Sequence, residues 1–184
     1  VPVSIVYDLI PDIKEMTEQS KGKDKSPESL AWMINYILKM GEDFGRVAIR
    51  FDDPVDAQGY HSAIIPDQEE HSYLDKNALP RFAFELVYRA NQINPVTTVS
   101  LVCHVLLGHF ALTKKEIEGY VSQLMHFIEK RKPNVLLDRG KPIGKSVQTA
   151  LNLLLRGNIV EKSQSGLDAR FLLSHNEYLQ ANYY

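Results

Sequence analysis

The sequence predicts an α/β fold in which a small sheet portion is followed by a mainly helical region. Val3, Ile5 and Tyr7 alternate with Ser4 and Val6, which is the period of a half- or fully buried β-strand. From residue 79 onward, apolar residues recur at the spacing of one helix face. The last third then indicates two helices and a hairpin. We therefore expect a division into residues 1–78, which carry the first strands, and residues 79–184, which carry most of the helices.

The first 78 residues are expected to contain two strands and one well-marked helix. The strand at the start is apolar on both faces, which suits a central position in a sheet whose other strands come from sequence beyond this chain. Ser26 can cap the first free amides of a helix, Pro27 suits its first turn, and Gly41 ends it. In chain order the expected elements are a strand at 1–7, a surface loop or frayed helix at 8–25, a helix at 26–41, a strand at 46–51 and a long loop at 55–77.

The second part is expected to be built around one apolar helix. Residues 96–110 are apolar on most sides, so they should form the centre of a helical core. Thr113 and Glu116 have the spacing of a capping box at the start of the next helix, and Gly157 closes a later one. In chain order the expected elements are helices at 79–93, 96–110, 113–128 and 143–156, then short strands at 159–161 and 170–173 around a turn at Ser165 and Gly166.

The last two of these helices are expected to pack on each other through their apolar faces. Four residues of the later helix, spaced three or four apart, form one such face, and four residues of the earlier helix should cover it. The expected facing sets are Ile143, Val147, Leu151 and Leu154 on the later helix, and Ile117, Tyr120, Leu124 and Ile128 on the earlier one.

Composition excludes several classes of site. Cys103 is the single cysteine, so the chain can form neither an intrachain disulfide nor a cysteine zinc site. The apolar run at 99–107 is too short to span a membrane as a helix. We find no phosphate-binding loop, no Gly-x-Ser-x-Gly elbow and no His-Glu-x-x-His pattern. The sequence therefore predicts no metal ligand set.

Charge is distributed unevenly along the chain, although the net charge is only −2. Residues 1–112 carry 10 basic and 16 acidic groups, a balance of −6, and residues 113–184 carry 11 basic and 7 acidic groups, a balance of +4. Such an asymmetry indicates that the two halves meet different surroundings. We expect the positive half, residues 113–184, to be attracted to an anionic membrane surface.

Two helices followed by a hairpin predict a winged-helix-like unit at the end of the chain. In such units the second helix can enter a DNA major groove, and Lys141 and Lys145 would lie at its start. Residues 146–150 of the same helix carry no cation, whereas sequence-specific DNA readers neutralise several phosphates. We therefore expect a packing unit and no nucleic-acid partner.

Several segments, taken in order, resemble a known family. Residues 1–8, Val-Pro-Val-Ser-Ile-Val-Tyr-Asp, match a block written hydrophobic-Pro-Val-x-Ile-x-Tyr-acidic. Residues 45–54 are similar to a strand written Val-x-Phe-Gly-x-Pro, with Asp52 in the place of the glycine. Together the segments resemble the C-terminal portion of the glycerol-3-phosphate acyltransferase family in its long bacterial, membrane-associated form, beginning at its fourth conserved block. The remaining segments that carry the resemblance are residues 25–30, 83–91 and 94–107.

The resemblance implies an enzyme of phospholipid synthesis. This enzyme would catalyse the first step of that synthesis, the transfer of a fatty acyl group from acyl-coenzyme A or an acyl carrier protein to the 1-hydroxyl of glycerol 3-phosphate, with no further cofactor. It also implies that residues 1–78 are the end of an acyltransferase α/β domain. In the family a His-x-x-x-x-Asp block supplies the base and a Phe-x-Glu-Gly block helps to hold the phosphate. Neither block occurs in this sequence, and both precede the fourth block in the family, so we expect part of a longer enzyme and no catalytic residue here.

Pro2 is the site residue that the resemblance carries over, because the family assigns the proline of its fourth block to the acyl-acceptor site. The alternative is that Pro2 is an ordinary proline at the start of a strand. Tyr7 and Asp8 are weaker substrate-binding candidates, since ligands of α/β sheets tend to lie at strand ends.

Two other functions stay open on the sequence alone. The same chemistry on dihydroxyacetone phosphate is one, because only the missing blocks could discriminate the acceptors. A non-enzymatic helical or winged-helix interaction module is the other. For the enzyme, the resemblance implies a membrane-associated protein at the cytoplasmic face of the cell membrane.

Overall fold

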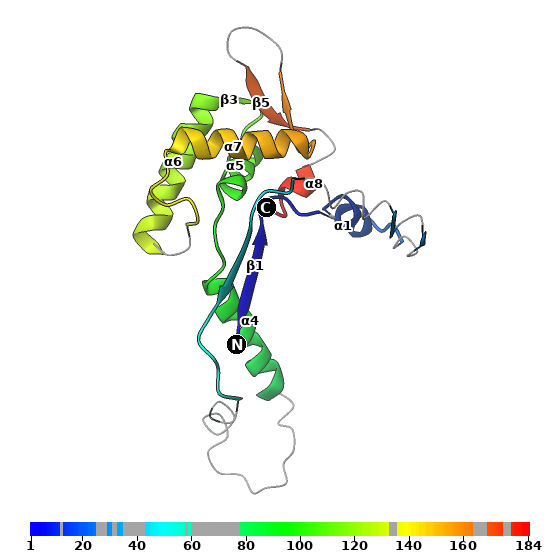
Figure 1. Ribbon diagram of the computed structural model, residues 1–184, viewed down its shortest axis with the longest axis vertical. Helices are drawn as coiled ribbons and strands as arrows, with labels where there is room; N and C mark the ends of the chain where they lie inside the picture. Colours follow the sequence, from blue (N-terminus) through cyan, green and yellow to red (C-terminus); the bar gives the residue numbers. More distant parts are fainter. Residues whose placement is uncertain are drawn as a thin grey trace, which may run out of the picture. The chain divides into compact units, whose positions relative to one another are not determined.

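The computed structural model describes residues 1–11, 13–24, 29–30, 33–34, 43–57, 59, 78–132, 136–163, 169–174 and 178–184. Within these ranges it contains six helices with described bounds and two small antiparallel sheets, which confirms the predicted mixed α/β class (Figure 1). The chain divides into two compact units. The first unit is Val1–Val6 with Ala48–Pro95, and the second unit is Tyr7–Val47 with Val96–Tyr184.

Strands β1 (Val3–Tyr7) and β2 (Val47–Phe51) pair with each other, which confirms both predicted strands. The amide of Asp52 donates to the carbonyl of Pro2 at 3.0 Å, and the amide of Asp8 donates to the carbonyl of Arg46 at 2.9 Å. Because the two pairs advance in opposite directions along the chain, the strands run antiparallel.

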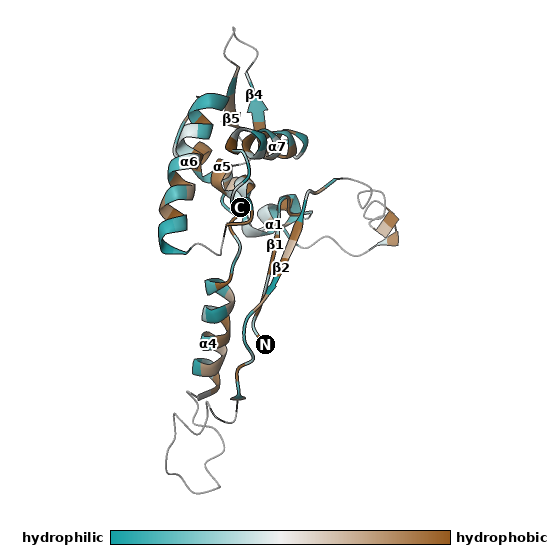
Figure 2. Ribbon diagram, turned by 60° about the vertical axis from the view of Figure 1, so that its left-hand side comes forward, coloured by the Kyte–Doolittle hydropathy of each residue, from teal (hydrophilic) through white to brown (hydrophobic). Residues whose placement is uncertain are grey.

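Apolar side chains of this sheet are largely uncovered in the first unit. Val3 and Ile5 of β1 are 40% and 52% exposed, and Ile49 and Phe51 of β2 are 54% and 70% exposed. Hydrophobic colouring marks both strands in Figure 2. An isolated two-stranded sheet is marginally stable in water. That further strands from outside this chain complete the sheet stays a prediction.

Helix α4 (Ala78–Gln92) completes the described elements of the first unit and confirms the helix predicted from residue 79. The chain leaves it just before Asn94 and Pro95, the predicted break. The hydroxyl of Ser4 donates to Asn94 Oδ1 at 2.6 Å, which ties β1 to the segment after the helix. Phe84 on the outer side of α4 is 72% exposed, so this helix also has apolar surface that the chain leaves uncovered.

Helix α1 (Ile13–Ser20) lies in the second unit, within the segment expected to be a loop or frayed helix. Its buried residues Ile13 and Thr17 are one turn apart, and the helix packs against α8 (Tyr178–Ala181), which the sequence did not predict. Three expectations lie wholly or mostly outside the described residues: the helix at 26–41, the loop at 55–77 and the turn at Ser165 and Gly166.

Three longer helices form the body of the second unit: α5 (Thr98–Leu107), α6 (Lys114–Arg131) and α7 (Ile143–Arg156). Each packs against the other two. The Thr113 hydroxyl accepts from the Glu116 amide, and the Glu116 carboxylate accepts from the Thr113 amide at 2.7 Å, which confirms the predicted capping box. A second capping box, formed by Thr97 and Ser100, starts α5 and had no counterpart in the prediction.

A three-stranded sheet in the order β3–β5–β4 covers one side of these helices. Strands β4 (Val160–Lys162) and β5 (Arg170–Leu173) form the predicted hairpin pair, with Val160 opposite Leu173. Strand β3 (Leu112–Thr113), which was not predicted, lies between α5 and α6 in the chain and pairs with β5 on its other side. At two residues it is too short for a sequence period to reveal it.

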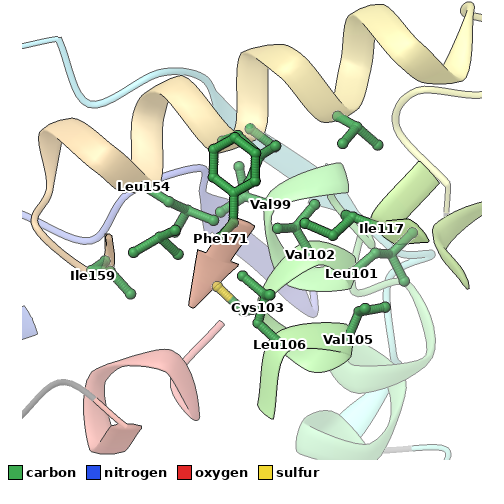
Figure 3. Packing of buried hydrophobic residues seen from close by; sticks show 14 of the residues in the cluster. Val99, Leu101, Val102, Cys103, Val105, Leu106, Ile117, Leu154, Ile159 and Phe171 are labelled. Carbon is green, nitrogen blue, oxygen red and sulfur yellow. The ribbon is translucent and has the colours of Figure 1, made fainter. Parts of the chain in front are cut away.

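One continuous hydrophobic core lies where α5, α6, α7 and the sheet meet (Figure 3). Val102, Ile117, Leu151 and Leu154 are each 0% exposed, so the predicted packing of α6 on α7 is correct in outline. Tyr120, however, is 39% exposed, and the expectation that it covers α7 is wrong. Val121, one position along the helix and 0% exposed, points inward instead, because a single residue turns a helical side chain by about 100°.

Candidate functional site

Pro2 lies directly before β1, and its side chain is buried. Its carbonyl accepts the 3.0 Å hydrogen bond from the Asp52 amide. The pyrrolidine nitrogen has no hydrogen to donate, which a first strand position tolerates. Ser4, two residues on and 7% exposed, lies on the same face of the strand by alternation. The structure therefore places Pro2 on the covered face of β1.

Tyr7 ends β1 and is 39% exposed. It lies five positions after Pro2, an odd number, so the alternation of a strand directs the two side chains to opposite faces. The structure therefore does not bring the two predicted substrate-binding residues together on one face of the strand.

A network of charged and polar side chains lies in the second unit. It begins at Asp8, directly after β1, and at Arg46, directly before β2. We call Asp8, Arg46, Thr98, Asp138 and Lys141 the Arg46 cluster. The Arg46 side chain donates from Nε to Asp8 Oδ2 at 2.8 Å, from Nη1 to Asp138 Oδ1 at 2.7 Å and from Nη2 to Asp138 Oδ2 at 3.0 Å. Thr98 Oγ1 donates to Asp138 Oδ2 at 2.6 Å, and Lys141 Nζ donates to Asp138 Oδ1 at 3.0 Å.

Backbone geometry makes this cluster possible. Gly45 has a φ of +77°, a left-handed conformation that glycine adopts without strain. A Cβ at Gly45 would lie 2.7 Å from the Cβ of Asp8. Glycine therefore allows the chain before β2 to approach Asp8 closely enough for the Arg46 amide to donate to Asp8 Oδ2 at 3.0 Å.

The ionisation of the cluster follows from its contacts. Burial by itself would raise the pKa of Asp138, but hydrogen bonds from Arg46, Thr98 and Lys141 together outweigh burial and hold that pKa well below its usual range. Hydrogen bonds to Asp138 and Asp8 raise the pKa of the Arg46 guanidinium further. A carboxylate held ionised in this way is a poor general base, so the cluster is better suited to holding the segments around Asp8 and Arg46 against the start of α5 within the second unit.

Sequence reasoning named Asp8 as a weak candidate beside Tyr7 and missed Arg46 and Asp138. The two residues are 92 positions apart, and no local period relates them. The signal that was available is the pair Gly45 and Arg46 directly before a strand, a glycine that permits close backbone approach followed by a cation.

Replacing Asp138 by asparagine is expected to lower the free energy of unfolding by about 2–3 kcal/mol at pH 7. Removing a buried ion-pair partner costs more than this, but Arg46 is half-exposed and water can solvate it once Asp138 is neutral. Folding lowers the pKa of Asp138. The difference in free energy of unfolding between the wild type and Asp138→Asn should therefore be constant above about pH 5 and shrink as the pH falls below about 4. Urea unfolding across this range measures it.

The matched control for this substitution is Glu129→Gln, which also neutralises an acid in an ion pair. Glu129 and Arg139 are both largely exposed, with Nε and Oε1 2.9 Å apart, so the control should change stability by less than about 1 kcal/mol. Equal losses for the two variants would show that the Arg46 cluster is no more than surface charge.

A cavity of about 520 Å³ lies in the second unit beside α1 and the end of α7, a volume within the range of small-molecule sites. Lys14 and Arg156 lie at its lining, and Arg156 Nη2 pairs with Asp43 Oδ2 at 2.9 Å. The hydroxyl of Tyr184 accepts from the Ile10 amide at 3.0 Å, and burial raises the pKa of Tyr184 to about 12. Neither predicted site residue lines this cavity.

Groups able to perform acyl transfer are not assembled in the part of the chain that the structure describes. None of its histidines, His104, His109 and His126, is hydrogen-bonded to a carboxylate; His109 Nδ1 lies 2.8 Å from the carbonyl of Val105. Burial raises the pKa of the Cys103 thiol to about 12, which disfavours the nucleophilic thiolate. Among the described residues no group of three or more His, Cys, Asp or Glu side chains could hold a metal ion.

Comparison with known families decides the class of this chain. A family model described as the glycerol-3-phosphate acyltransferase C-terminal region matches residues 16–184. The chain belongs to this family. Arg46, Thr98, Asp138 and Lys141 of the Arg46 cluster lie within the matched residues of the acyltransferase C-terminal region, whereas Pro2 precedes them.

Two relatives illustrate the similarity. The "Putative acyltransferase plsB1" of Mycobacterium tuberculosis (strain ATCC 25618 / H37Rv) is 25% identical over 185 residues, which cover 100% of this chain and 29% of the relative. The "Glycerol-3-phosphate acyltransferase" of Pseudoalteromonas atlantica (strain T6c / ATCC BAA-1087) is 24% identical over 195 residues, which cover 100% of this chain and 23% of the relative. The chain therefore spans less than a third of the length of these curated relatives.

The resemblance to an acyltransferase C-terminal portion is confirmed by these matches. Within the described residues, no helix of this acyltransferase C-terminal region has the length and apolar character to cross a bilayer.

Proposed function

We propose that this chain is the C-terminal portion of a glycerol-3-phosphate 1-O-acyltransferase, the enzyme that begins phospholipid synthesis. The observation that carries the proposal is the family match over residues 16–184. Relatives named as acyltransferases, one of them as a glycerol-3-phosphate acyltransferase, support it.

The proposed reaction moves an acyl group from a thioester of coenzyme A or of an acyl carrier protein. The 1-hydroxyl oxygen of glycerol 3-phosphate attacks the thioester carbonyl, the carbon–sulfur bond breaks, a new ester forms, and the hydroxyl proton ends on the departing thiol. A base must receive that proton first. Since the sequence contains no His-x-x-x-x-Asp block, we assign the base to the remainder of the longer enzyme and a supporting role to this chain.

Pro2 and Tyr7 remain our proposed substrate-binding residues, with Pro2 at the acyl-acceptor site. The division at residue 78, with an acyltransferase α/β domain ending there, is part of the same proposal.

For the second unit we propose a winged-helix-like arrangement. Its support is the element order α5, β3, α6, α7, β4, β5 together with the sheet order β3–β5–β4, in which α6, α7 and the β4–β5 hairpin correspond to the predicted two helices and hairpin.

The partners that we propose are glycerol 3-phosphate, the acyl donor and an anionic membrane surface, with no nucleic acid and no further cofactor. We place the enzyme at the cytoplasmic face of the cell membrane, because both the acyl donors and glycerol 3-phosphate are charged metabolites and the product is a membrane lipid precursor.

The test of the proposed function uses the full-length enzyme. We expect thiol release from acyl-coenzyme A that depends on glycerol 3-phosphate, and we expect Pro2→Ala to raise the KM for the acceptor more than the KM for the donor. Dihydroxyacetone phosphate is the matched comparison acceptor. A kcat/KM that favours dihydroxyacetone phosphate would assign the enzyme to that acceptor instead. Absence of transfer to either acceptor would favour a non-enzymatic interaction module.

A further inference from the structure

The outer face of α6 carries exposed aromatic side chains. Ile117 and Val121 of this helix are 0% exposed and point into the core, whereas Tyr120 and Phe127 are 39% and 53% exposed. Tyr120 and Phe127 are seven residues apart, so they lie on the same side of the helix, one above the other. A helix of a water-soluble surface more often presents polar residues there, so two aromatic rings in line require a reason.

A third exposed aromatic residue lies in the segment that contacts this face. Phe110, between α5 and β3, is 82% exposed, more than any other large apolar residue for which the structure gives an exposure. Its neighbour His109 places its ring 4.5 Å from the ring of Tyr120. That contact ties the segment carrying Phe110 to the outer side of α6.

Cations end the same face. Lys130 and Arg131 lie in the last turn of α6, and both are exposed. The Arg131 guanidinium carbon lies 3.7 Å from the centroid of the Phe127 ring, a cation–π contact that holds the charge beside the aromatic surface. The neighbouring acid, Glu129, pairs with Arg139 at 2.9 Å. The end of α6 therefore presents positive charge beside aromatic rings.

The acids at the other end of the helix are also engaged. Glu116 accepts from Thr113 in the capping box at 2.7 Å, and Glu118 lies 3.5 Å from Lys114. Positive charge on the outer face is thus concentrated at the C-terminal turn, and a further lysine, Lys132, is the C-cap of the helix. An anionic surface approaching from this side would meet cations and aromatic rings together.

We propose that Phe110, Tyr120, Phe127, Lys130 and Arg131, here called the aromatic–cationic face, dock the protein on an anionic lipid bilayer. The proposal rests on the proposed function, for which it names the docking surface. Tyrosine rings reside at the depth of lipid headgroups, and phenylalanine rings insert at the same boundary from interfacial helices. Lys and Arg are attracted to anionic lipids. The two adjacent cations beside the rings complement a negatively charged surface, which is why the proposal commits to an anionic bilayer.

Vesicle co-sedimentation of the chain of residues 1–184 tests the proposal without depending on acyl transfer. Vesicles of phosphatidylcholine with 30% phosphatidylserine are compared with vesicles of phosphatidylcholine alone. We expect binding to the anionic vesicles that salt weakens, and we expect the K130A/R131A variant to bind them roughly 25-fold more weakly, at about fivefold for each cation removed. Phe127→Ser is expected to weaken binding about fivefold by removing apolar contact.

The matched control is K21A/K23A, which removes two exposed cations from the segment after α1 and should keep wild-type binding. Circular dichroism and thermal unfolding verify that each variant is folded. We expect all of them to fold, because the substituted side chains are exposed. Equal binding by K130A/R131A and by the control would overturn the proposal, as would equal binding of the wild type to neutral and anionic vesicles. So would salt-sensitive binding to duplex DNA that the K130A/R131A substitution abolishes while lipid binding persists.

Discussion

A purified polypeptide of residues 1–184 is expected to transfer no acyl group to glycerol 3-phosphate. General-base catalysis contributes roughly 100- to 10,000-fold to rate, and this chain contains no His-x-x-x-x-Asp block. The cluster that the structure does assemble, around Arg46 and Asp138, holds its carboxylate ionised and fully hydrogen-bonded, so it cannot substitute as the base. Thiol release from acyl-coenzyme A, followed with and without glycerol 3-phosphate, measures the transfer.

The matched control is the full-length enzyme assayed at the same molar concentration. Transfer by the full-length enzyme with none by residues 1–184 is the expected pair of results. Transfer by residues 1–184 at a rate near that of the full-length enzyme would contradict the prediction, and it would place a catalytic group in this chain. A cooperative unfolding transition of the short polypeptide excludes misfolding as the cause of its inactivity.

Local sequence signals predicted the elements that a few residues determine. The Thr113 and Glu116 capping box was readable because its two residues contact each other across one turn, and the break at Pro95 was readable because proline cannot continue a helix. Strand β3 was not readable, since its two residues, Leu112 and Thr113, pair with Phe171 and Arg170 of β5, 59 and 57 positions away. Register across such a separation depends on how the helices pack, which no local period encodes.

The direction of side chains was harder to predict than the elements. Tyr120 and Val121 are both apolar enough to belong to a core, and the sequence assigned Tyr120 to it. The core accepts Val121 instead, and Tyr120 lies outside against His109. The apolar strand β1 posed the opposite problem: its pattern predicts burial, yet Val3 and Ile5 are 40% and 52% exposed. That strands from outside this chain cover them stays a prediction.

The candidate site was less predictable than the fold. Pro2 and Tyr7 came from resemblance, and the alternation of β1 separates their side chains onto opposite faces. Asp138 could not have been found, because its importance comes from partners at positions 46 and 98, contributed by other elements. A cluster assembled from separate elements is a property of the packed chain, so it becomes visible only once the packing of the helices is known.

Leu154→Ala is expected to lower the free energy of unfolding of the second unit by about 3–4 kcal/mol, a cavity-forming loss typical of a buried leucine. Leu154 is 0% exposed on α7 and belongs to the cluster that includes Ile159 and Phe171 (Figure 3). Since α7 packs against both α5 and α6, neighbouring side chains can close the cavity little without shifting a helix. Urea unfolding followed by circular dichroism measures the loss.

Leu79→Ala is the matched control, because it makes the same chemical change on α4, where Leu79 is 67% exposed. An exposed leucine contributes little, so this variant should stay within about 0.5 kcal/mol of the wild type. If Leu154→Ala does not fold, Leu154→Met keeps the side-chain volume and should lose less than about 1.5 kcal/mol. Similar losses for Leu154→Ala and Leu79→Ala would mean that the helices of the second unit are not held by the core described here, since exposure would then have no bearing on what a leucine contributes.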